Sequence, residues 1–352
     1  MIITNKIIQS ILMKALACLM LFFLSPVLQA QDGGFAGGAF HMGYSARGLA
    51  MGNSMSAVTT QGIYSYYNPA LSATLSENRQ IDLSIASMEY DRYVQTAGVH
   101  FQLPPSAGMS FMILHSGIRD IDGRSVSGYP TDRFDAADLQ LRTDFGIRMS
   151  DNLHGGIGLK FSLADYHPEL EKATSFGVDL GMLLKTDYAM NFAVSVKDLF
   201  AGYNWNTQEL YGLDRAQNSL EAFPTRVTLG TAYESSKWVI SAEYEHIISK
   251  TDIRTRQVVT IEGSPTYQTV TEDVTSTLSQ IRLGASVHLH ERLTLRGGWG
   301  LPSLENTNSW NLSTGFSIHL PFDNLQPSID YAFVKEPYRI SNMHMFTLRL
   351  NI

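Results

Sequence analysis

The feature that most constrains this chain is an alternation of apolar and polar residues that begins near residue 80 and continues to the last residue. In the segment 139–149 the odd positions are mostly apolar, whereas the even positions include Gln140, Arg142 and Asp144. Because successive side chains of a strand point to opposite faces, this pattern predicts strands with one apolar and one polar face. The runs reach about 10 residues, which exceeds the usual strand of soluble sheets and suits a strand that crosses a bilayer at a tilt.

Counting such runs predicts about 14 strands. We place them at 80–90, 93–103, 107–116, 138–149, 154–164, 174–185, 190–198, 225–234, 238–249, 278–290, 292–299, 310–320, 326–335 and 343–352. Short connections such as 150–153 and 235–237 alternate with long ones such as 117–137 and 199–224. Long loops at one end and tight turns at the other are typical of outer-membrane barrels. We therefore predict an all-β fold, a transmembrane antiparallel β-barrel that occupies residues 80–352.

Residues 1–30 have the features of a secretory signal peptide. Lys6 and Lys14 are basic, residues 15–24 form an apolar core, and small residues precede a cleavage site after Ala30. The alternative is an uncleaved anchor helix. The single cysteine, Cys18, lies in the apolar core, so the predicted mature chain has none. The predicted location is the outer membrane, reached by export.

Composition excludes several other classes of protein. The net charge of −7 gives no basic excess for nucleic acid, and one cysteine cannot form an internal disulfide. The sequence contains neither a His-Glu-x-x-His nor a Gly-x-Ser-x-Gly motif. We therefore predict no enzymatic activity, no cofactor and no metal site. A soluble β-sandwich is the physical alternative to the barrel, and the signal peptide, the strand lengths and aromatic residues near strand ends oppose it.

Residues 31–79 differ from the rest, because they are rich in small residues and show no sustained alternation. Short helices are predicted at 46–51 and 69–73, the second capped by Asn68. The segment contains, in order, Ser45, Ala46, Arg47, Gly48, Met51, Gly52, Asn68, Pro69 and Ala70. These residues resemble the opening of the PorV/PorQ family, which belongs to the wider class of FadL-like outer-membrane barrels. The resemblance implies that residues 31–79 form a hatch, or plug, at the periplasmic end of a 14-stranded barrel.

A plug also makes physical sense. A barrel of about 14 strands encloses a lumen wide enough to leak, whereas about 8 strands are filled by their own side chains. Arg47 is expected to pair with carboxylates on the predicted inner face, which carries Asp82, Asp144, Asp179, Glu243 and Asp330. The simplest interpretation of the segment is a plug that packs on the wall and binds no ligand.

Two long connections need separate interpretations. Residues 252–275 alternate around Gly263, which predicts an extracellular hairpin extending beyond the membrane; the alternative is two more wall strands, giving 16. The connection 199–224 carries Tyr203, Trp205 and Tyr211. These aromatic residues form either a partner-binding loop or a loop that folds back over the mouth of the barrel.

Two functions from different classes follow. The resemblance implies association with the type IX secretion system, in which such barrels bind exported cargo or assist its attachment at the surface. The alternative is a FadL-like transporter of hydrophobic small molecules, with the ligand in the lumen and a lateral opening at a strand kink; a purely structural barrel is a third possibility. The expected partners are outer-membrane lipids with secreted cargo or secretion-system proteins, or a hydrophobic ligand. Weak points for a kink are the strand glycines Gly98, Gly156, Gly158, Gly284, Gly297 and Gly298.

Overall fold

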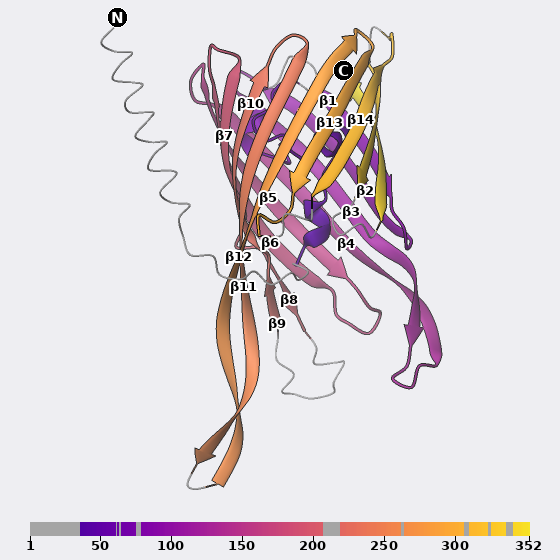
Figure 1. The fold of residues 1–352 in the computed structure, drawn as a ribbon, viewed down its shortest axis with the longest axis vertical. Coiled ribbons are helices and arrows are strands. Elements are labelled where there is room, and N and C mark those ends of the chain that lie inside the picture. The colour runs from indigo at the N-terminus through magenta and orange to yellow at the C-terminus, as the bar shows by residue number, and fades with distance from the viewer. Residues whose placement is uncertain are drawn as a thin grey trace, which may run out of the picture. The chain divides into compact units, whose positions relative to one another are not determined.

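The fold was examined in a computed structural model (Figure 1). The structure describes residues 36–352 except 61, 63–64, 75–78, 207–218, 262–263, 306–309, 323–324 and 336–340, and it describes only the backbone of 252–273. The predicted signal peptide and Tyr211 therefore lie outside the described residues. Among the residues described, no helix has both the length and the hydropathy needed to cross a bilayer.

Fourteen antiparallel strands close into one barrel, in which sequence neighbours are hydrogen-bonded and β1 pairs with β16. The wall strands are β1 (Gln80–Ser87), β2 (Arg92–Leu103), β3 (Ala107–Arg124), β4 (Pro130–Arg148), β5 (Leu153–Asp165), β6 (Ala173–Lys185), β7 (Met190–Leu199), β10 (Thr225–Glu234), β11 (Trp238–Ile261), β12 (Ser264–His290), β13 (Leu293–Leu301), β14 (Asn311–His319), β15 (Ser328–Lys335) and β16 (Asn342–Asn351). A separate two-stranded sheet, β8 (Gly202–Trp205) and β9 (Ser219–Ala222), lies within the 199–224 connection. The predicted barrel and its strand number are confirmed.

The alternation predicted from the sequence appears as alternating burial along each strand. In β16, Met345, Thr347 and Arg349 are buried inside the barrel, whereas Phe346 and Leu348 are 52% and 40% exposed on its outer surface. Large apolar side chains exposed around the outer wall are what a lipid-facing band requires. The inner face carries polar and charged residues that are nevertheless buried. Another part of the chain must therefore cover them inside the lumen.

One long connection contains more strand than the sequence indicated, and another forms the paired strands of the predicted hairpin. Residues 117–137 were expected to form a loop, but β3 and β4 stay paired as far as Arg124 and Pro130, with register shifts after Ile118 and Asp122. The expectation failed because this extension is exposed on both faces and so shows no clean alternation. β11 and β12 pair without a break out to Ile261 and Ser264 (Figure 1). The alternative of 16 wall strands is wrong, because the closed wall holds fourteen.

The described part of residues 36–74, called here the N-terminal segment, packs against the inner wall. It contains η1 (Gly38–His41), α2 (Ala46–Ala50) and η2 (Pro69–Thr74), close to the helices predicted. α2 contacts β13 to β16, and η2 contacts β2 to β6 on another part of the wall. Figure 1 shows both helices in indigo within the ring of strands. The side-chain oxygen of Asn68 accepts a hydrogen bond from the amide of Ala70 at 3.0 Å, so the predicted cap is confirmed.

Candidate functional site: a plugged lumen with an apolar cavity

α2 is fixed to the wall by a buried ion pair. Arg47 Nε lies 2.7 Å from Asp330 Oδ2, and Arg47 Nη2 donates a hydrogen bond to Ser328 at 2.7 Å. The amide of Ala46 donates to Thr347 Oγ1 at 2.8 Å. The sequence predicted that Arg47 meets a luminal carboxylate, and the structure identifies Asp330 of β15 as that partner. A buried pair of this kind fixes position more than it adds stability, because burying both charges costs desolvation energy.

Glycines on the inner face let the backbone of the N-terminal segment approach the wall. A Cβ placed on Gly298 would lie 2.2 Å from the amide nitrogen of Gly52, and one on Gly156 would lie 2.3 Å from the carbonyl carbon of Pro69. A Cβ on Gly181 would lie 1.9 Å from Asn68 Oδ1. Larger residues at these positions would displace the segment. Most of the glycines expected to mark strand kinks therefore serve a different role, since the ladders run through them without a register shift.

The nine residues of the predicted hatch motif all lie in this docked segment. Ser45, Ala46, Arg47, Gly48, Met51, Asn68, Pro69 and Ala70 are buried, and Gly52 lies against β13. Asn68 Nδ2 donates to the carbonyls of Met182 and Ser56, which joins β6 to another part of the segment. Gly48 faces Tyr67, where a Cβ would lie 2.0 Å from the tyrosine hydroxyl. That these residues act as a hatch remains a proposal.

A chain of buried ion pairs crosses the inner face from β4 to β12. It begins with Arg142, which contacts Asp144 at 2.9 Å and Asp179 at 2.8 Å. Lys160 then joins Asp179 to Asp198, with the first contact at 2.6 Å. Arg142 also donates to the carbonyl of Ser65, so the chain of charges is attached to the N-terminal segment.

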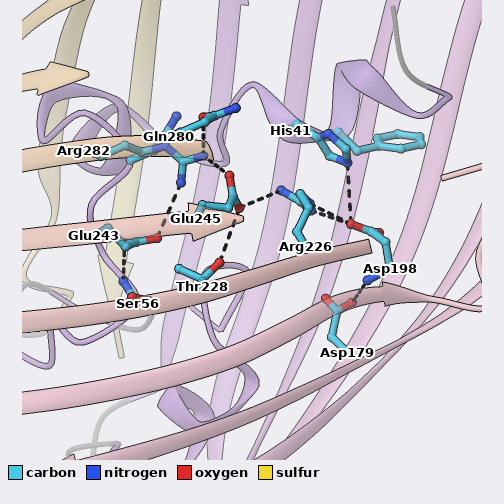
Figure 2. A network of polar contacts seen from close by, with 12 residues as sticks. His41, Ser56, Asp179, Asp198, Arg226, Thr228, Glu243, Glu245, Gln280 and Arg282 are labelled. Atoms are coloured by element: carbon cyan, nitrogen blue, oxygen red, sulfur yellow. Dashed lines mark hydrogen bonds and ion pairs between the residues drawn. The ribbon is translucent and has the colours of Figure 1, made fainter. Parts of the chain in front are cut away.

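Figure 2 shows the second half of this series of ion pairs. Arg226 Nη2 lies 2.7 Å from Asp198 Oδ2 and Arg226 Nη1 lies 3.6 Å from Glu245 Oε1. Arg282 then contacts both Glu245 and Glu243. Parity along the strands places Arg226, Glu245 and Arg282 on the polar face, so the sequence contained the signal for them. Asp198 breaks the parity: with its φ of 62° and the register shift between β6 and β7, it is buried on the inner face beside Lys197, which lies there by parity.

His41 and Ser56 attach the N-terminal segment to this network. His41 Nε2 lies 3.6 Å from Asp198 Oδ2, and the amide of Ser56 donates to Glu243 Oε2 at 3.2 Å. Burial lowers the pKa of His41, and the nearby Arg226 guanidinium lowers it further. The imidazole is therefore neutral at pH 7, and its proximity to Asp198 is not a full ion pair.

A cavity of about 420 Å³ lies between the N-terminal segment and the wall from β12 to β16. Its lining is largely apolar and includes Met42, Leu49, Leu301, Val334 and Met343. The neighbouring inner surface continues this apolar lining with a cluster that contains Met88 after β1, Val94 of β2, Ala332 of β15 and Met345 of β16. An apolar patch is unusual on the inner face of a barrel whose lumen is otherwise polar. The volume falls within the range of small-molecule sites.

The predicted partner-binding loop is folded onto the barrel. Tyr203 and Trp205 are 0% and 9% exposed, and Tyr203 donates a hydrogen bond to Asp138 Oδ1 at 2.8 Å. Tyr166 donates to the same carboxylate at 3.0 Å and its ring packs on Trp205. The two residues thus lack the exposed surface that the prediction assumed, because aromatic stacking and Asp138 hold them inward. A role in partner binding remains a prediction.

The outer wall carries a groove of about 480 Å³ over β1 to β4. It is lined by apolar side chains such as Leu83, Ala97 and Phe111, and it reaches Gly98. On the luminal side the hydroxyl of Tyr44 fills the space beside Gly98, 1.9 Å from where a Cβ would stand. At Gly98 the wall therefore carries no side chain of its own, and Tyr44 of the N-terminal segment covers this point from the lumen.

These features define an outer-membrane β-barrel whose lumen is filled by its own N-terminal segment. No protein-family model matches the chain, and neither does any curated protein sequence. Solved structures do match. The Pseudomonas putida toluene transporter TodX is similar at TM-score 0.57 and 12% identity over 88% of this chain and 96% of that chain.

Two further solved structures agree. A Pseudomonas aeruginosa FadL homologue is similar at TM-score 0.57 and 12% identity, over 88% of this chain and 98% of that chain. The CymD monoaromatic hydrocarbon channel is similar at TM-score 0.56 and 13% identity, over 88% and 97%. The chain thus has the fold of FadL-like outer-membrane channels.

Proposed function

We propose that this protein is an outer-membrane channel that takes up hydrophobic small molecules and binds them in the cavity between the N-terminal segment and β12 to β16. The observation that carries the proposal is the apolar part of the cavity lining, which includes Met42 and Met343 and continues into a buried apolar cluster of the inner wall, inside an otherwise polar lumen. Flexible, polarisable methionine side chains adapt to apolar ligands of different shape. The three similar channels include a toluene transporter and a monoaromatic hydrocarbon channel, which supports the proposal at the level of the fold.

The point at Gly98 is the proposed way out of the lumen. The outer groove reaches Gly98 from the lipid side of β1 to β4. Tyr44 covers Gly98 from the lumen, and the β1–β2 and β2–β3 pairings continue through it, so a sideways exit needs both the displacement of Tyr44 and a local opening of one of these pairings. An apolar molecule that leaves there enters lipid without crossing water.

Uptake into proteoliposomes tests the proposal. Val334→Trp fills the cavity from β15, and we expect uptake of toluene to fall strongly. Phe333→Trp is the matched control, because this residue is the next on the same strand and belongs to the opposite face. Equal uptake by the Val334→Trp variant and the parent would exclude the cavity as the binding site.

Association with the type IX secretion system is the second proposal, and it rests on the N-terminal resemblance. We place it after small-molecule uptake, because Tyr203 and Trp205 are buried and the apolar cavity is too small for a protein. Affinity isolation from outer membranes distinguishes the two. Co-purification of exported proteins, lost when the surface loops are altered, would reverse this order.

A further inference from the structure

The cavity has a basic side chain at its edge, Arg282, which would be the natural partner of an anionic ligand. Its guanidinium is already occupied by two carboxylates (Figure 2). Arg282 Nη1 lies 3.5 Å from Glu243 Oε1, and Arg282 Nη2 donates to Glu245 Oε2. The Glu243 and Glu245 side chains are 1% and 2% exposed, whereas Arg282 is 19% exposed and lines the cavity.

The buried network that contains Arg282 balances its basic side chains with carboxylates. Five carboxylates face five basic side chains along the inner wall: Asp144, Asp179, Asp198, Glu243 and Glu245 against Arg142, Lys160, Lys197, Arg226 and Arg282. His41, which also lines the cavity, is 3.6 Å from Asp198. Arg92 at the cavity edge donates to the carbonyl of Glu89 and to Ser341.

The polar groups of the lining are engaged as well. Asn53 donates to the carbonyl of Met42 at 3.0 Å and accepts from Tyr67 at 2.7 Å. Ser313 accepts from the amide of Gly52 and donates to the carbonyl of Ala50. Gln280 Oε1 accepts from Arg282 at 3.1 Å. These polar groups interrupt the apolar lining, but their hydrogen bonds are already made within the protein.

We propose that Glu243 and Glu245 make this cavity selective for uncharged ligands, by neutralising Arg282 before a ligand arrives; the inference rests on the proposed uptake function. A carboxylate that entered would lose its hydration and find Arg282 shared by two negative side chains. An alcohol or hydrocarbon of the same size loses little by comparison and gains the apolar surface of Met42, Leu49 and Val334.

Two probes of matched size test the selectivity on the purified full-length barrel. Binding of benzyl alcohol and of sodium benzoate is measured by saturation-transfer NMR at pH 7.5. We expect benzyl alcohol to bind at least about tenfold more tightly than benzoate. Benzoate that binds as tightly would overturn the selectivity while leaving the uptake function intact. Binding of neither probe would refute the proposed function itself.

The glutamates are tested by neutral substitutions made one at a time, Glu243→Gln and Glu245→Gln. Each leaves Arg282 with one carboxylate fewer, and we expect benzoate affinity to rise by about tenfold with little change for benzyl alcohol. Asp144→Asn is the control, because it removes a carboxylate from the same network at a point that does not line the cavity. Heat-modifiable gel mobility confirms that each barrel is folded. A folded variant with unchanged benzoate affinity would refute the role of that glutamate.

Discussion

At the scale of single residues, the lumen is organised by ion pairs. The sequence pattern predicted that these charged residues face the lumen, but not which of them contact one another. The family resemblance assigned Arg47 to the N-terminal hatch, alternation assigned Asp330 to the inner wall, and their contact at 2.7 Å follows from where α2 docks. Asp198 escaped prediction because it sits at a bulge with positive φ, where strand parity fails. Residue-scale prediction therefore worked for regular strand positions and failed at an irregular one.

The Arg47–Asp330 pair makes a prediction for the stability of the docked segment. Asp330→Asn leaves a buried arginine without its carboxylate, which typically costs about 3–5 kcal/mol. Hydrogen exchange of the α2 amides should accelerate accordingly, while the strands stay protected. Asp122→Asn breaks the exposed Arg124–Asp122 pair instead, and we expect an effect below about 1 kcal/mol. Unchanged exchange in α2 after Asp330→Asn would contradict the anchoring role.

His41 makes the docking of the segment dependent on pH. The docked state lowers the pKa of His41, whereas a released imidazole titrates near its usual value of about 6.5. Docking is therefore fully favoured above pH 6.5 and weakens as the pH falls below that value, because the released state then binds the proton more readily. Proteolysis within residues 36–60 should rise between pH 7.5 and 5.5. His41→Gln should remove this dependence; if the dependence persists, another group is responsible.

At the scale of elements, the strands whose two faces differ in burial could be predicted from the sequence. The membrane-spanning parts of the strands show a clean two-residue period because lipid and lumen differ in polarity, and their positions were predicted. The extensions of β3 and β4 have water on both sides, so their pairing left no such trace. The apolar cavity was not predictable, because its lining combines the N-terminal segment with strands distant in the chain.

The N-terminal segment is expected to be the element that closes the pore. A Cβ on Gly230 would lie 3.7 Å from the Ala57 Cβ, which suits a disulfide once the Ser56 hydroxyl, 2.1 Å from that Cβ, rotates away. We expect the reduced Ala57→Cys, Gly230→Cys variant to conduct ions in planar bilayers when moderate urea releases the segment. The oxidised form should stay closed at the same urea concentration. Each single-cysteine variant is the control, and equal conductance in both redox states would show that the closure lies elsewhere.

At the scale of the whole molecule, the described residues form a barrel with an apolar exterior and a charged lumen that holds the N-terminal segment, and the proposed function adds a bound hydrophobic molecule. The fold could be predicted from the sequence, since a repeated two-residue period allows few other structures. The candidate site could not be predicted, because it lies between the N-terminal segment and strands distant from it in the sequence. The similarity of this chain to FadL-like channels concerns the fold, so binding of a hydrophobic molecule in the cavity needs an experiment of its own.

Photolabelling of the intact barrel tests whether the cavity binds a hydrophobic molecule. A small aryl diazirine is added to the protein in lipid nanodiscs, irradiated, and its attachment sites are mapped by mass spectrometry. We predict labels at Met42, Leu49, Val334 and Met343, and we predict that excess toluene suppresses them. Labels confined to lipid-facing residues such as Leu83 and Phe346, with no effect of toluene, would show that the cavity does not bind such a molecule.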